Sequence, residues 1–261
     1  MGLRAEISVL LLVGATLLVG SAHADERASA AGRYALEIGG VRHGLVRTVE
    51  SAEKSPSGQP LLVLGAQDIS PALGTFVDGF VRGSVAKKEL RLTSGAVMRK
   101  ANDARLFSVK LPALGSGNIA DLELAFVAPA VTTQPLLSAK EAPPPSPGAR
   151  ITTFRLGITG MEAIEAPKLD SITLTQKPDG TASTGEIGFE VAAGGAPPFV
   201  AWQKASATKS LPRGLDVEYV AVDGSAMIKL RFDRCTLASL KPLGASGTTR
   251  ITMACGTARG S

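Results

Sequence analysis

Hydrophobic and polar residues alternate along most of the chain, and a period of two residues is typical of strands with one buried face. In the first half this pattern predicts strands at Tyr34–Ile38, Leu61–Leu64, Leu90–Leu92 and Leu122–Phe126. In the second half it predicts strands at Ile172–Leu174, Ile187–Val191, Val217–Ala221, Ile228–Phe232 and Ile251–Cys255. The dipeptide Asp223-Gly224 separates two of these strands and indicates a tight hairpin turn. The chain is therefore expected to be mainly β.

Two segments break the alternation and favour helices. Ser70–Gly83 carries apolar residues at helical spacing, and Pro198–Ser206 places Phe199 and Trp202 three residues apart after a proline. Each half of the chain is thus expected to contain one short helix.

A proline-rich segment divides the chain. Four of the five residues 143–147 are proline, and such a run cannot lie in a helix or a central strand. We predict a linker at residues 138–149 that joins two domains of almost equal length, residues 25–137 and residues 150–261.

The two halves are similar in sequence. Tyr34–Val41 aligns with Phe154–Met161 through an aromatic residue, a leucine, an isoleucine and a glycine, and the apolar positions of Leu122–Phe126 align with Ile251–Cys255. A duplication would give two tandem small β-barrel or sandwich domains, each with one short helix. Chance similarity between two β-rich segments is the alternative.

The first 24 residues have the pattern of a secretory signal peptide. Ile7–Gly20 is an apolar run too short for a comfortable membrane span, and Ala22-His23-Ala24 offers small residues for cleavage before Asp25. A retained N-terminal anchor is the alternative. We expect a secreted or periplasmic protein with no membrane span in the mature chain.

Composition restricts the possible chemistry. The chain has only two histidines, and His23 lies in the predicted leader, so His43 would be the only imidazole of the mature protein. A site built from several histidines is then excluded within one chain, and any catalytic triad would have to use His43. His43 itself follows Gly39-Gly40 and is expected to be exposed in a turn. We predict neither an enzyme nor a bound metal or cofactor.

Positive charge is concentrated between Arg82 and Lys110, where eight basic residues accompany two acidic ones. Such a cluster suits a protein interface, a polyanion or simply a solvated face. Phe107 is the only aromatic residue inside it, which disfavours base stacking, so no nucleic acid is expected. The candidate interface residues are Arg82, Lys87, Lys88, Arg91, Arg99, Lys100 and, outside the cluster, Trp202.

Cys235 and Cys255 are the only cysteines, and an even number in an exported protein suggests a disulfide. If residues 235–241 and 249–255 form an antiparallel hairpin, the two cysteines can lie directly opposite each other, at a Cα separation of about 4.5–5.5 Å. Two free buried thiols are the alternative.

The order of these elements resembles the phage tail-tube superfamily, which includes the Hcp tube protein of type VI secretion. Each half opens with an aromatic-x-Leu-x-Ile-x-Gly strand, at Tyr34 and at Phe154. The second half continues with a helix that contains Trp202, a hairpin with Asp223-Gly224 at its turn, and the closing strand Ile251–Cys255. In that family small β-barrels flanked by a helix assemble into rings that stack as a hollow tube. The export signal departs from the family pattern.

The resemblance implies an exported structural protein that assembles with itself into rings. With two barrels per chain, three chains would form a trimer with pseudo-six-fold symmetry. A monomeric secreted β-sandwich that binds a polysaccharide, lipid or protein partner is the second hypothesis, and a secreted hydrolase on a β scaffold is the third.

Overall fold

The computed structural model describes residues 33–55, 58–84, 86–95, 97–115, 121–136, 148–244 and 247–260, with the backbone alone at residues 48–53. The leader predicted at residues 1–24 and most of the linker predicted at residues 138–149 lie outside these ranges. The described part of the chain is mainly β, as expected, with two short α-helices and a short 3-10 helix at Ala193–Gly195.

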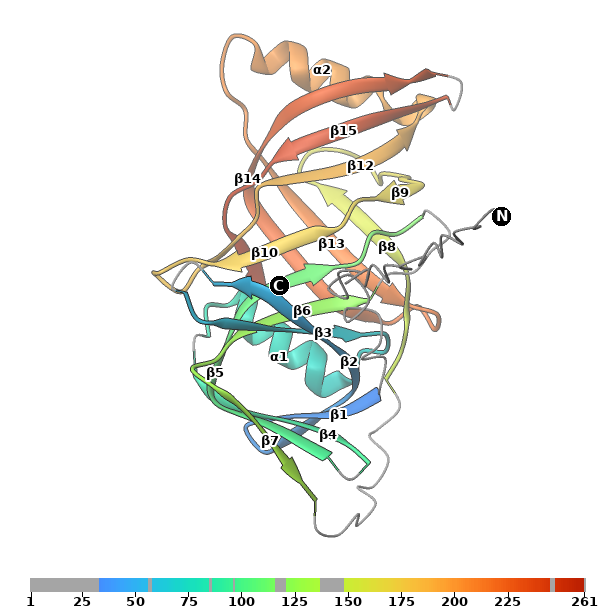
Figure 1. Ribbon diagram of the computed structural model, residues 1–261. Helices are drawn as coiled ribbons and strands as arrows, with labels where there is room; N and C mark the ends of the chain where they lie inside the picture. Colours follow the sequence, from blue (N-terminus) through green and yellow to red (C-terminus); the bar gives the residue numbers. More distant parts are fainter. Residues whose placement is uncertain are drawn as a thin grey trace, which may run out of the picture.

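Six antiparallel strands of the first half close into a β-barrel (Figure 1). Around the barrel each strand pairs with the next, in the order β1-β2-β3-β6-β5-β4, and β4 pairs with β1 to close it. These strands are β1 (Arg33–Ile38), β2 (Val41–Lys54), β3 (Pro60–Ala66), β4 (Lys88–Ser94), β5 (Val97–Leu111) and β6 (Leu122–Val127). A barrel leaves no free edge along most of its strands, so their backbone groups are paired without help from a neighbour.

The second half forms a second antiparallel sheet. Its strand order is β8-β13-β14-β15-β12-β9, and β16 pairs with β14 beside this path. These strands are β8 (Ile151–Ile158), β9 (Lys168–Leu169), β12 (Glu186–Ala192), β13 (Arg213–Ala221), β14 (Ala226–Leu243), β15 (Thr248–Ala254) and β16 (Ala258–Gly260). An isolated bridge between Leu156 and Ile164 brings the chain that follows β8 back against β8.

Two strands from the second half belong to the sheet of the first half. β10 (Ile172–Gln176) pairs with the end of β5, and β11 (Ala182–Ser183) pairs with β10. The strand expected at Ile172–Leu174 is therefore present, but its neighbour is the barrel. A further strand, β7 (Val131–Pro135), pairs with the beginning of β5.

Both expected helices are confirmed, as α1 (Pro71–Val81) and α2 (Pro197–Ser206). Each begins with proline, whose missing N–H costs nothing in the first turn. The Ser70 side chain accepts a hydrogen bond from the Leu73 N–H and caps α1, a contact worth about 1 kcal/mol. In Figure 1 α1 lies within the outline of the barrel, and it contacts β2 as well as β14 and β16, whereas α2 lies at the far end of the second sheet.

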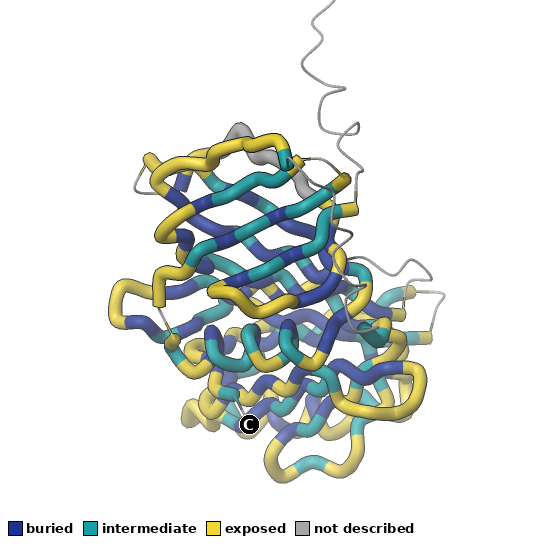
Figure 2. Tube along the Cα trace, turned by 90° about the horizontal axis from the view of Figure 1, so that it is seen from below, coloured by how far each residue is buried: buried dark blue, intermediate teal, exposed yellow. Residues whose placement is uncertain are grey.

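The alternation that predicted the strands corresponds to burial on one face, and Figure 2 shows buried and exposed segments alternating along the chain. One core cluster contains buried residues from both halves. Its largest side chains include Phe80, Phe126, Phe189, Trp202 and Tyr219. The two sheets therefore share hydrophobic stabilisation.

Strand β2 was not expected from the sequence. Only the Gly39-Gly40 pair forms the turn, with positive φ at both residues, and the chain enters β2 at Val41. A register shift after Leu36 disturbs the alternation in the paired strand, which is why the apolar pattern of this segment is weak.

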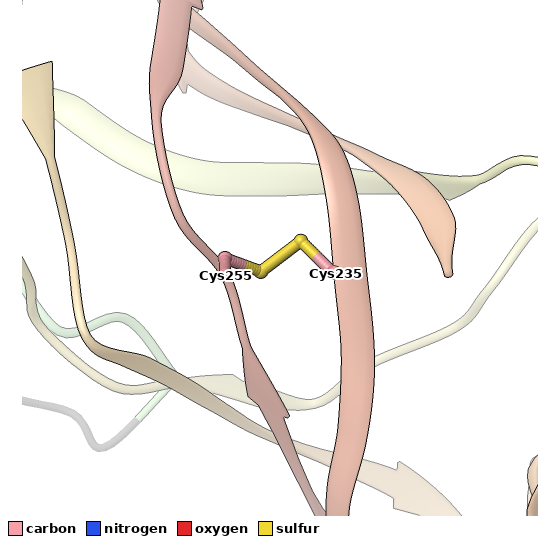
Figure 3. The surroundings of a disulfide bond; sticks show 2 residues. All are labelled: Cys235 and Cys255. Atoms are coloured by element: carbon pink, nitrogen blue, oxygen red, sulfur yellow. A yellow bond between two sulfur atoms is a disulfide. The ribbon is translucent and has the colours of Figure 1, made fainter. Parts of the chain in front are cut away.

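The disulfide between Cys235 and Cys255 is present, with a Cα separation of 4.3 Å (Figure 3). The β14–β15 ladder pairs Thr236 with Ala254 next to it, in the register expected from the sequence. A bulge between Leu237 and Ser239 then shifts the rest of the ladder by one residue. The bridge thus fixes the point at which β14 leaves β13 and begins to pair with β15.

Replacing Cys235 and Cys255 together by alanine is expected to lower the free energy of unfolding by about 2–4 kcal/mol, because the bridge restricts the unfolded chain. Urea denaturation followed by far-UV circular dichroism measures the change. The unmodified protein under reducing conditions is the control and should lose a similar amount. An unchanged midpoint in both samples would contradict the stabilising role of the bridge.

Candidate functional site

The basic cluster is partly neutralised by acidic residues on the barrel surface. Arg91 and Lys100 both form ion pairs with Glu89, the lysine at 2.5 Å, and Arg91 also reaches Glu37 at 3.4 Å. The Lys100 hydrogen bond, with help from Arg91, holds the pKa of Glu89 below its ordinary value. Arg91 and Lys100 are therefore already engaged by acidic neighbours on the exposed barrel surface.

The other candidate cations lie in different surroundings. Arg82, just after α1, forms an ion pair of 2.9 Å with Asp78 on α1. Both side chains lie so close to Gly260 of β16 that a Cβ there would collide with them, so Arg82 lies at a contact inside the chain. The Arg99 guanidinium lies 5.7 Å from the centre of the Tyr34 ring. Lys87 and Lys88 are exposed. The structure therefore does not gather the predicted cations into one free patch.

Trp202 is not an interface residue, because its ring is buried inside its own half of the chain. Only 2% of the residue is exposed, and the indole N–H donates a hydrogen bond of 2.8 Å to the Leu211 carbonyl. The Arg213 guanidinium lies 5.3 Å from the ring centre. Trp202 anchors α2 and the loop after it to the second sheet.

His43 is also not where the sequence suggested. It lies on β2 and is 5% exposed, with its ring centre 5.4 Å from that of Phe76 on α1. The Ser70 hydroxyl donates a hydrogen bond of 2.9 Å to the His43 carbonyl, so β2 and the start of α1 are tied together. The prediction of an exposed turn failed because the turn ends at Gly40, three residues earlier, and the chain is already in β2 at Val41.

His43 borders a cavity of about 380 Å³ between α1 and the barrel. The lining is mainly apolar, including Ile38, Phe76, Phe80 and Leu106, and Lys88 supplies a positive charge. Burial, and to a smaller extent the charge of Lys88, lowers the pKa of His43, so the imidazole is neutral at pH 7. The cavity suits a small, mostly apolar molecule.

No cluster of potential metal ligands occurs in the part of the chain that the structure describes. Asp179 and Asp223 have lowered pKa values, but the cause lies in their turns: each carboxylate accepts hydrogen bonds from Thr181 or Ser225, two residues later. Within the same described ranges, no helix is long and apolar enough to cross a membrane.

The most extensive polar contact between the halves is a strand ladder. β10 pairs with β5 over four residue pairs, from Ile172 with Leu111 to Thr175 with Ser108. Val109 and Leu111 on the receiving strand are completely buried. A second pairing lies just beyond it, where Leu114 and Leu169 exchange backbone hydrogen bonds of 2.8 and 2.9 Å.

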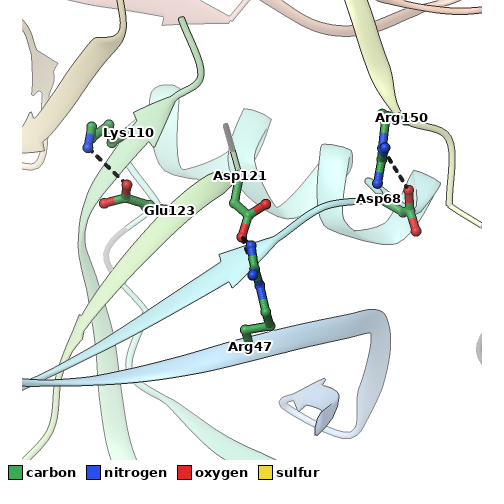
Figure 4. A network of polar contacts seen from close by, with 6 residues as sticks. All are labelled: Arg47, Asp68, Lys110, Asp121, Glu123 and Arg150. Carbon is green, nitrogen blue, oxygen red and sulfur yellow. Dashed lines mark hydrogen bonds and ion pairs between the residues drawn. The ribbon is translucent and has the colours of Figure 1, made fainter. Parts of the chain in front are cut away.

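The chain that enters the second half is also fixed to the barrel. Ile69 and Ala149 exchange backbone hydrogen bonds of 2.9 and 3.1 Å, and Arg150 lies 3.8 Å from Asp68. Figure 4 shows this pair together with two ion pairs on the barrel, Lys110 with Glu123 at 2.9 Å and Arg47 of β2 with Asp121 just before β6. These backbone contacts hold the halves in a defined relation.

In the part of the chain that the structure describes, the last part of β14 has no neighbouring strand of the kind that β10 provides for β5. β14 pairs with β13 as far as Cys235, and from Thr236 onward it pairs with β15 on its other side. Among the described residues, no strand pairs with Leu237–Leu240 on the side that β13 has left. A row of backbone donors and acceptors is thus available there.

Comparisons with models of known protein families and with curated proteins find no match for this chain. The resemblance to tail-tube proteins therefore rests on the order of sequence elements alone. The geometry of the two sheets and of their contact is what the function must be inferred from.

We expect His43 to make stability depend on pH in the mildly acidic range. A lowered pKa in the folded state means that the unfolded chain binds a proton first, so stability is complete above the ordinary value of 6.5 and falls as the pH drops below it. Urea denaturation of protein that starts at Asp25 should show this loss between about pH 7 and pH 5. His43→Leu should flatten the dependence, and an equal slope in both proteins would contradict it.

Proposed function

We propose that the protein is an exported structural subunit that associates head to tail into a ring, as the resemblance to tail-tube proteins implies. Each chain would supply two repeats of one fold, and three chains would complete a ring of six repeats. The supporting observations are the matching strand ladders of the two halves and the strand that passes from one half to the other.

Corresponding ladders support the repeat. Ala101 on β5 pairs with Val131 on β7, and 129 residues later Leu230 on β14 pairs with Gly260 on β16. Strand order agrees as well, because β1-β4-β5-β6-β3 in the first sheet corresponds to β8-β13-β14-β15-β12 in the second. Two unrelated folds have no reason to share both order and register.

The first strand of each half refines the sequence alignment. Leu36 pairs with Leu92, and the counterpart of Leu92 on β13 is Tyr219, which pairs with Phe154. The ladders thus match Leu36 to Phe154, whereas the sequences match it to Leu156. A shift of two residues keeps the same face of the strand toward the core.

The observation that carries the proposal is the pairing of β10 with β5. It joins two similar units through different surfaces, a projecting strand on one and a strand edge on the other, which is a heterologous contact. In such a contact the first half uses only its receiving edge and the second half only its projecting strand. The projecting hairpin of the first half and the receiving edge of the second half are left for other chains. Repetition of the same contact between chains closes a ring or continues as a filament.

A monomeric binding module is the second candidate function, and the cavity beside His43 is the observation that favours it. An apolar cavity of about 380 Å³ with a positive charge from Lys88 could hold a small amphipathic anion. This function requires no self-association, so the oligomeric state separates the two.

Protein that starts at Asp25 is expected to have the mass of three chains in solution, because three heterologous contacts close a ring of six repeats. Multi-angle light scattering between about 1 and 100 µM measures the mass, and negative-stain microscopy should show rings with six lobes. A monomer over the whole range would contradict the proposed function and favour the binding module.

A further inference from the structure

We propose that Val49–Ala52, near the tip of the β2–β3 hairpin, adds as a strand to the free edge of β14 at Leu237–Leu240 in a second copy of the chain. This inference rests on the proposed function and names the surfaces that would form the ring. The two surfaces are the counterparts of β10 and β5, which already pair within one chain.

The projecting hairpins of the two halves correspond in register. In the first half Val46 on β2 pairs with Ala66 on β3, and 123 residues later Leu169 on β9 pairs with Phe189 on β12. The same displacement takes Ile172–Thr175 of β10 back to Val49–Ala52. The donor strand of the existing contact thus has a counterpart in the first half.

The two hairpins also end in the same kind of turn, at a displacement of 122 residues because the β2–β3 ladder has a register shift between Glu50 and Lys54. In one, the Lys177 N–H bonds to the Thr181 carbonyl and the Gly180 N–H bonds to the Lys177 carbonyl, at 2.8 and 3.0 Å. In the other, Ser55 bonds in the same way to Gln59, and Gly58 bonds to Ser55, at 2.9 and 2.8 Å. Gly180 and Gly58 both have positive φ. The tip that reaches the barrel in one half is therefore reproduced in the other.

The receiving edge is available on β14. The displacement of 129 residues that relates β5 to β14 takes Ser108–Leu111 to Leu237–Leu240. The two strands are bulged at different points, and beyond both bulges the displacement takes Lys110, which pairs with Glu123, to Ser239, which pairs with Thr252. Leu111, which pairs with Ile172 of β10, is completely buried, whereas its counterpart Leu240 remains partly exposed. An added strand would pair the free backbone groups and cover this apolar surface, as strand addition does in other proteins.

The helices give a second, independent correspondence. α1 packs against β14 so closely that a Cβ at Gly74 would lie 3.1 Å from the Met227 carbonyl oxygen. Val77 on α1 is 0% exposed, whereas its counterpart on α2, Val200, is 40% exposed. The surface that α2 would meet in the next chain includes Val97 on β5 and Val131 on β7, which are also exposed.

Both contacts fit one arrangement of neighbouring chains. Within a chain the second half donates its hairpin to the first half and receives α1 on β14 and β16. In the proposed contact the next chain donates its first-half hairpin to β14 and receives α2 on β5 and β7. In both contacts the unit that donates the hairpin also receives the helix of its neighbour. Every chain would therefore use the same pair of surfaces.

The register predicts which residues face each other across the new contact. Thr173 pairs with Lys110 in the existing ladder, and their counterparts are Glu50 and Ser239. Opposed residues of antiparallel strands have Cα atoms about 4.5–5.5 Å apart, within reach of a disulfide. The test is therefore a pair of cysteines at Glu50→Cys and Ser239→Cys in protein that starts at Asp25.

Mild oxidation of this double variant should give covalent dimers and trimers on a non-reducing gel. The matched control is Thr173→Cys with Lys110→Cys, which should cross-link within one chain and keep the mass of a monomer. A second control pairs Glu50→Cys with Lys229→Cys, where β13 occupies the edge, and it should give no multimers. Light scattering of the reduced proteins measures their association in parallel.

The outcomes separate the inference from the proposed function. Covalent multimers of the Glu50–Ser239 variant, with none from either control variant, would support the inference and the proposed function. Trimers in solution without this cross-link would overturn the inference and leave the ring intact. Monomers without cross-links would overturn both.

Ala52→Pro gives a test that needs no cysteine, because proline removes one backbone donor from the added strand. The variant should remain folded by circular dichroism, but the protein concentration at which it associates should rise at least tenfold. A folded variant that associates as well as the unmodified protein would overturn the inference.

Discussion

The pairing of backbone groups along β5 is the constraint on which the rest of the structure depends. β5 has 15 residues and is longer than any other strand of the barrel. Its first part pairs with β4 and β7, and its second part pairs with β6 and β10. A strand of this length extends beyond the reach of β4, and β10 pairs with the backbone groups along the rest of that edge.

The second half meets the same constraint with a different outcome. β14 has 18 residues and leaves β13 at Cys235, where the disulfide to Cys255 fixes the change of partner. No strand of the described chain takes the place that β10 takes on β5. The free edge of β14 therefore follows from the length of the strand, because β14 continues past the last residue that β13 pairs with.

Charge has a smaller part in this arrangement than the composition suggests. Arg91 and Lys100 are paired with Glu89, and Arg82 lies beside β16 within the chain. Exposed ion pairs contribute little to stability, whereas a ladder pairs several backbone groups and buries apolar side chains at once. Strand addition would thus be a stronger basis for the proposed association than the basic cluster.

The sequence by itself determined the positions of most strands, both helices and the pairing of Cys235 with Cys255, because periodicity records which face of an element is buried. It also pointed to a repeat. Only the tertiary structure decided that His43 is buried on β2, that Trp202 belongs to the core, and that β10 lies on β5. Backbone hydrogen bonds join any two strands of suitable length, so side-chain alternation does not specify which strand becomes the neighbour. The edge that the fold leaves unpaired is therefore decided by how the whole chain closes.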